Sequence, residues 1–109
     1  MPTTLIYSGR FVFAHNVSGV DPITNDNPGP LIISTVTAYC GAELGGSFTF
    51  EDDVDGVMLF YTVPALPSDP NVRNKVWTRL HIVWDAGRTF RIITDPGWDY
   101  SVHGYKFST

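Results

Sequence analysis

The sequence predicts an all-β fold, an antiparallel β-sandwich of about seven or eight short strands, with a small β-barrel as the alternative. In residues 76–107, apolar and polar side chains alternate through three runs, separated by Asp-Ala-Gly at 85–87 and Asp-Pro-Gly at 95–97. Residues 31–40 are rich in β-branched side chains, which favour strands. No segment keeps helical periodicity over three turns. These observations predict one β domain over residues 1–109.

The first strand is predicted at residues 4–13, where apolar and polar side chains alternate around a central Gly9 that suggests a bulge or a close backbone approach. One face is predicted to carry Leu5, Tyr7, Phe11 and Phe13, and the other Ser8 and Arg10. Residues 16–30 contain Asp-Pro, Asn-Asp-Asn and Pro-Gly-Pro sequences, which predict a long connection without a strand. Because connections of this length often contribute to binding, it is a candidate functional loop.

The middle of the chain predicts further strands and a second large loop. Residues 31–40 form the second strand, and a glycine-rich turn at 41–46 leads to a short strand at 47–50. Residues 57–63 are apolar on both faces, which indicates a central strand or one at a subunit contact. Three prolines in residues 64–74 exclude a central strand or a helix there.

The three alternating runs of residues 76–107 predict a β-meander, in which consecutive strands pair. A three-residue loop at 85–87, with Gly87 in the left-handed conformation, keeps the apolar side chains of the joined strands on one face, whereas a two-residue loop would mix the faces. The same reasoning favours a loop at 96–98. The side chains predicted to face the core are Leu80, Ile82, Trp84, Phe90, Ile92, Tyr100 and Val102.

The outward face of this meander would gather aromatic and hydrogen-bonding side chains. Aromatic rings offer flat apolar surfaces, and arginine and histidine offer directional donors, a combination that suits sugars, carboxylates or an acidic protein surface. Beside the turn at 95–97, Trp98 could stack on a pyranose ring while Asp99 accepts its hydroxyl protons. The candidate ligand-binding residues are Trp77, Arg79, His81, Arg91, Trp98, Asp99, His103 and Tyr105.

Length and composition exclude several classes of protein. A chain of 109 residues can bury one hydrophobic core without disulfides or metal, but not two independent cores. Its formal net charge is -4, and its seven lysine and arginine residues are scattered, so nucleic acid is not an expected partner. The single Cys40 cannot form an intrachain disulfide and is interpreted as a small buried apolar residue.

No apolar run is long enough to span a membrane. Residues 1–4 lack the positively charged start of a signal peptide, which favours a cytoplasmic protein.

His15, His81 and His103 share no metal-ligand spacing, and no phosphate-binding or dinucleotide motif is present. We therefore expect neither a metal nor a cofactor.

Two further patterns are weak. Asp53-x-Asp55-Gly56 is similar to the opening of a calcium loop, but the later oxygen ligands of an EF-hand are missing, so an acidic hairpin turn at 51–55 is the favoured interpretation. Asp99, Ser101 and His103 have the residue types of a catalytic triad, yet no Gly-x-Ser-x-Gly motif accompanies them, and a triad is not expected.

We therefore expect a non-catalytic module that binds carbohydrate, or another polar ring-containing ligand, on the meander face. By size and composition the chain is similar to small, cysteine-poor, lectin-like sandwiches, although no motif carries that comparison. One alternative is a small barrel enzyme of the cyclase or isomerase type with an aromatic-lined cavity. Another is a structural or inhibitory domain that forms a homodimer through residues 57–63 and exposed aromatic side chains.

Overall fold

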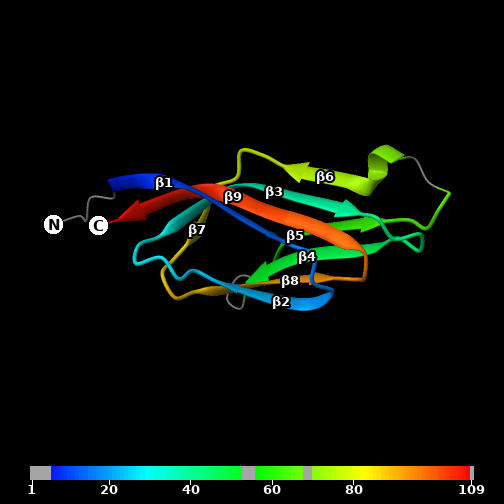
Figure 1. Cartoon of the computed structure of the whole chain (residues 1–109), viewed down its shortest axis with the longest axis horizontal. Coiled ribbons are helices and arrows are strands. Elements are labelled where there is room, and N and C mark those ends of the chain that lie inside the picture. Colours follow the sequence, from blue (N-terminus) through cyan, green and yellow to red (C-terminus); the bar gives the residue numbers. More distant parts are fainter. Residues whose placement is uncertain (1–5, 53–55, 68–69, 109) are drawn as a thin grey trace.

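A computed structural model describes residues 6–52, 56–67 and 70–108 and shows two antiparallel sheets packed face to face (Figure 1). Sheet A contains β1 (Ile6–His15), β9 (Trp98–Ser108) and β3 (Leu31–Cys40), followed by β6 (Asn74–Trp77) and β7 (Ile82–Trp84), which both pair with β3. Sheet B contains β2 (Gly19–Thr24), β8 (Thr89–Thr94), β4 (Gly46–Asp52) and β5 (Gly56–Val63). A short 3₁₀ helix, η1 (Pro70–Arg73), precedes β6. The predicted β-sandwich is confirmed.

The prediction that residues 76–107 form a meander is wrong. Strand β7 pairs with β3, β8 pairs with β2 and β4, and β9 pairs with β1 and β3, so both turns carry the chain from one sheet to the other. The local geometry at Gly87 is as predicted, with a φ of 78°. Alternation could not distinguish the two arrangements, because the strands of a hairpin and the strands of a crossover both turn an apolar face toward the core.

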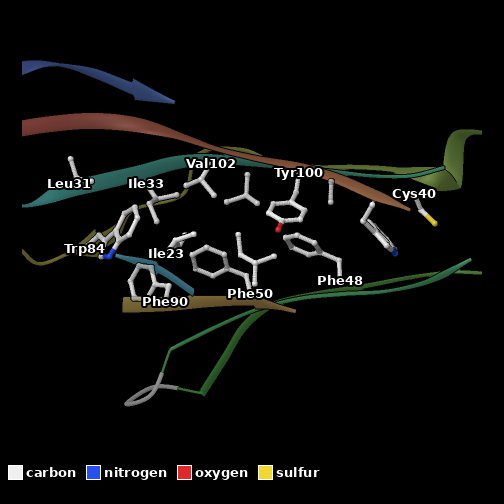
Figure 2. Close-up of a cluster of buried hydrophobic side chains, with 14 of the residues drawn as sticks. Ile23, Leu31, Ile33, Cys40, Phe48, Phe50, Trp84, Phe90, Tyr100 and Val102 are labelled. Carbon is white, nitrogen blue, oxygen red and sulfur yellow. The ribbon is translucent and has the colours of Figure 1, made fainter. Parts of the chain in front are cut away.

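The predicted core face of these C-terminal strands is nevertheless correct. Side chains from both sheets meet in the space between them, where Ile33 and Val102 of sheet A lie over Phe50 and Phe90 of sheet B (Figure 2). Burial of this apolar surface is the main favourable contribution to folding. Of the predicted core residues, Leu80 and Ile82 are partly buried, and the fully buried ones are Trp84, Phe90, Ile92, Tyr100 and Val102.

An irregularity in β1 changes which of its side chains face outward. The register with β9 shifts between Tyr7 and Gly9, which confirms the bulge suggested by Gly9. Because one extra residue reverses the alternation, Tyr7 lies outward opposite Phe107. The prediction that Tyr7 shares a face with Phe11 is therefore wrong.

A second irregularity places Trp77 on the inner side of sheet A. The chain leaves the sheet at residues 78–81, between β6 and β7, opposite a register shift in β3. The Trp77 ring stacks on Phe48 with 5.5 Å between ring centroids, although the even-numbered Ile82 also packs against the core. The outward position predicted for Trp77 is wrong because alternation was counted through a segment that does not continue the strand.

Two other segments differ from their predicted roles. Residues 16–30 contain β2, and Pro22 is tolerated within it because β2 is an edge strand that pairs only with β8. Strand β5 lies at the other edge of sheet B and is not central, with Val57 and Phe60 each 58% exposed. A subunit contact through β5 stays a prediction.

The crossover from β7 to β8 is held by a buried asparagine. Asn25 is 2% exposed, and its side-chain amide donates hydrogen bonds to the carbonyl oxygens of Trp84, at 2.7 Å, and Gly29, at 3.2 Å. The backbone N–H of Gly87 donates to the carbonyl of Asn25 at 2.9 Å. Asn25 therefore ties the end of β2 to the turn that changes sheets.

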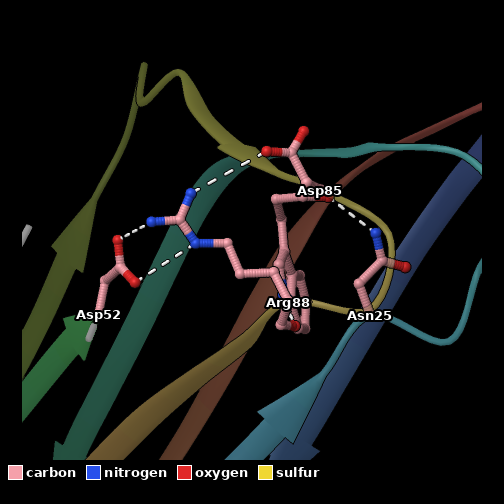
Figure 3. A network of polar contacts seen from close by, with 5 residues as sticks. Asn25, Asp52, Asp85 and Arg88 are labelled. Atoms are coloured by element: carbon pink, nitrogen blue, oxygen red, sulfur yellow. Dashed lines mark hydrogen bonds and ion pairs between the residues drawn. The ribbon is translucent and has the colours of Figure 1, made fainter. Parts of the chain in front are cut away.

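Arg88 adds an ion pair beside this turn (Figure 3). Its guanidinium donates to both carboxylate oxygens of Asp52, whose side chain is 2% exposed, and lies 4.0 Å from a carboxylate oxygen of the exposed Asp85. Asp52 thus has a cationic partner in the fold. Asp53 and Asp55, on which the calcium alternative depends, lie outside the described residues.

Candidate functional site on the outer face of sheet A

The structure does not bring the eight predicted ligand-binding residues onto one surface. Trp98 is 1% exposed and packs against Phe48 in the core, and Trp77 also faces inward. Arg91 lies in sheet B, where its Nε donates to Glu51 at 2.9 Å. Arg79 and His81 belong to the irregular segment between β6 and β7. The predicted residues that share a surface are Asp99, His103 and Tyr105, on β9.

These three residues belong to the outer face of sheet A, whose strands β1, β9 and β3 lie side by side (Figure 1). Cross-strand pairing places Arg10 beside Tyr105, Val12 and Thr35 on either side of His103, Ala14 and Thr37 on either side of Ser101, and Tyr39 beside Asp99. We call the ten residues of this array the sheet A face: Arg10, Val12, Ala14, Thr35, Thr37, Tyr39, Asp99, Ser101, His103 and Tyr105.

The centre of the sheet A face is a chain of hydrogen-bonded side chains. Thr37 and Ser101 share a hydroxyl–hydroxyl hydrogen bond, and the Ser101 hydroxyl lies 2.7 Å from Nε2 of His103. All three side chains are half-buried, so each is held in place while it can still reach a ligand. The face therefore presents a pre-organised row of polar groups.

The Ser101–His103 contact does not make a catalytic triad with Asp99. Asp99 and His103 lie four residues apart on one strand, which separates their backbones by about 13 Å. An acid at that distance cannot orient the imidazole, and the triad requires such an orienting hydrogen bond. In the structure, Asp99 therefore does not orient the His103 imidazole.

Exposed tyrosine rings stand at the two ends of the polar row. Tyr105 is 37% exposed and contacts Tyr7, with 6.0 Å between ring centroids. The Arg10 guanidinium lies over the Tyr105 ring, 6.0 Å from its centroid. At the other end, Tyr39 is 43% exposed beside Asp99.

Two shallow hollows follow this face. The first, which we call the Arg10 groove, has a volume of about 340 Å³ and is lined by Arg10, Ser34, Thr35, His103 and Tyr105 among others. The second, of about 510 Å³, is lined by residues that include His15, Thr37, Tyr39, Asp99 and Ser101. The hollows lie at opposite ends of the hydrogen-bonded row and together make a surface for an elongated ligand.

Sequence reasoning missed Arg10, Thr35, Thr37 and Tyr39. The alternation of residues 31–40 could have placed Thr35, Thr37 and Tyr39 on one face, had the break in β3 been recognised. The pairing of Arg10 with Tyr105 depends on the bulge near Gly9, and alternation does not reveal the exact position of that bulge.

A polar cluster around the buried Asp21 borders the second hollow and joins the two sheets. Asp21 of β2 is 6% exposed and accepts hydrogen bonds from the hydroxyl of Tyr100, at 2.6 Å, and from Nδ1 of His15, at 2.9 Å. Burial of the Tyr100 phenol, and then its hydrogen bond to the negative Asp21, raise the pKa of Tyr100 well above its ordinary value. Sequence reasoning did not predict this cluster, because Tyr100 is far from His15 and Asp21 in the chain.

Tyr100 is expected to make the protein less stable at high pH. The folded state holds the phenol proton more tightly than the unfolded state, so its stabilising contribution is complete below pH ~10, the ordinary tyrosine pKa, and is lost as pH rises toward the folded pKa. Over that range this group should lower the free energy of unfolding by about 1.4 kcal/mol per pH unit.

Urea unfolding at a series of alkaline pH values measures this slope. The Tyr100→Phe variant should lose that component of the pH dependence, and the Tyr39→Phe control, which removes an exposed phenol, should keep it. Equal slopes for the wild type and Tyr100→Phe would contradict the assignment.

Comparison with known proteins adds no family, since no protein-family model and no curated protein matches the chain. In the part of the chain that the structure describes, no helix is both long and apolar enough to cross a membrane. Among those same residues, no three histidine, cysteine or acidic side chains gather as metal ligands would. The choice of the sheet A face as the candidate site therefore depends on its geometry alone.

Proposed function

We propose that this protein is a non-catalytic carbohydrate-binding module whose ligand lies along the sheet A face. The observation that carries the proposal is the row of hydroxyl and imidazole groups between two exposed tyrosine rings, Tyr105 and Tyr39. Tyrosine offers apolar ring surface together with a hydroxyl, which suits the apolar faces and polar edges of sugars. Threonine, serine and histidine side chains both donate and accept hydrogen bonds, as sugar hydroxyls do.

The length of the face favours an oligosaccharide over a single sugar. Tyr105 and Asp99, the neighbour of Tyr39, are six residues apart on β9, a span of about 20 Å in an extended strand. A ligand that reaches both tyrosines must bridge the polar row between them. Because the row is already ordered by its internal hydrogen bonds, little side-chain entropy is lost on binding.

The packing supports a binder over the enzyme alternative. An aromatic-lined internal cavity was the feature expected of a small barrel enzyme. The space between the two sheets is instead occupied by packed side chains, including Phe48, Phe50 and Phe90 (Figure 2). The hollows that contain the functional groups of the sheet A face lie on its surface.

Replacement of either tyrosine is expected to weaken oligosaccharide binding. Tyr39→Ala and Tyr105→Ala should each lower the affinity about tenfold, since each removes an aromatic contact worth roughly 1.4 kcal/mol. A glycan array identifies a bound oligosaccharide, and calorimetric titration with that sugar measures the change.

Phe60→Ala is the matched control, because Phe60 is an aromatic residue on β5 of the opposite sheet that is more exposed than either tyrosine. It should leave the affinity unchanged, and thermal unfolding should show that all three variants remain folded. A folded protein that binds no oligosaccharide on the array would overturn the proposal.

A further inference from the structure

The Arg10 groove has an unusual electrostatic character for an acidic protein. The chain has eleven acidic and seven basic side chains, yet none of the residues that line this groove is acidic. Arg10 is exposed, and within the residues that the structure describes it makes no ion pair. By contrast, Arg88 and Arg91 are each paired with a carboxylate. The nearest acid on the sheet A face is Asp99, at the opposite end.

The groups around Arg10 suit a carboxylate. A guanidinium can donate two parallel hydrogen bonds to the two oxygens of a carboxylate, a geometry that lysine cannot provide. The Tyr105 ring beneath Arg10 restricts the guanidinium before a ligand arrives. Ser34 and Thr35 add hydroxyl groups to the same groove, and His103 adds an imidazole ring.

We infer that the oligosaccharide bound by the sheet A face is an acidic one, whose sugar carboxylate is held by Arg10 in the Arg10 groove. This inference rests on the proposed function, because it names the class of sugar that the same face binds. It places the acidic ring beside Tyr105 and leaves the rest of the oligosaccharide to extend along Ser101 and Thr37 toward Tyr39.

Uronic-acid oligosaccharides and their methyl esters provide a direct test, since esterification removes the charge and keeps the sugar ring. Calorimetric titration with oligomers of galacturonic, glucuronic and mannuronic acid should find at least one that binds about tenfold or more tightly than its methyl ester, as expected for a charge-assisted hydrogen bond. The preference should shrink at high salt, because Arg10 is exposed and salt screens its charge.

Arg10→Gln should abolish the preference for the acid, so that this variant binds the acid no more tightly than it binds the ester. Lys75→Gln is the matched control, because it removes one positive charge from β6, where the Lys75 ammonium lies over Tyr61 and Trp77 on the inner side of the sheet. This control should keep the preference.

The possible results separate the two proposals. If acids and esters bind equally well, or if Arg10→Gln keeps the preference, the inference about the carboxylate is overturned and the proposed carbohydrate binding stands. If no acid and no ester in the panel binds, and the glycan array is also blank, both are overturned.

Discussion

Gly104→Ala is expected to destabilise the fold severely. Gly104 lies in β9 between β1 and β3, and a Cβ atom there would collide with the backbone carbonyl of Ile32 and lie 2.8 Å from a ring carbon of Phe11. Because β9 is hydrogen-bonded on both sides, neither neighbour can move away without loss of pairing. We expect a loss of more than ~3 kcal/mol, a large part of the stability of a small domain.

Urea unfolding and near-ultraviolet circular dichroism measure this effect. Gly87→Ala is the control, since a Cβ at Gly87 would meet no atom within 4 Å and the cost would come only from its left-handed backbone, about 1 kcal/mol. If Gly104→Ala were as stable as Gly87→Ala, this result would contradict the close approach of β3 to β9 at Gly104.

Asp52→Ala is expected to destabilise the protein by about 3–5 kcal/mol. The substitution leaves the Arg88 guanidinium, whose side chain is 27% exposed, without the buried carboxylate that it contacts with two of its nitrogens. Loss of one partner costs more than the pair itself contributes, because the remaining charge stays partly desolvated. Thermal or urea unfolding gives the change in free energy.

Two further variants test this explanation. Glu51→Ala breaks the more exposed ion pair with Arg91 and should cost about 1 kcal/mol or less. The double variant Asp52→Leu/Arg88→Met should recover much of the loss, because it removes both charges together. An Asp52→Ala variant no less stable than Glu51→Ala would show that the buried ion pair contributes no more to stability than the exposed one.

The candidate site was only partly predictable from the sequence. The alternation in residues 98–107 correctly assigned Tyr100 and Val102 to the core, and it therefore left His103 and Tyr105 outward. The neighbours of these residues depend on the register with β1 and β3, and both of those registers contain a shift. A prediction that assumed pairing along the chain therefore placed Arg91 and His103 on one face, although the two lie in different sheets.

The sequence by itself determined the strand-rich class, the turns near Gly87 and Gly97, and the inward side of most strands. These features depend on local backbone geometry and on a period of two residues, both of which can be read within one segment. The tertiary structure alone decided that β7, β8 and β9 pair with distant strands. A turn that folds back within a sheet and one that crosses to the opposite sheet bury the same apolar side chains, so the choice between them depends on contacts with the rest of the chain.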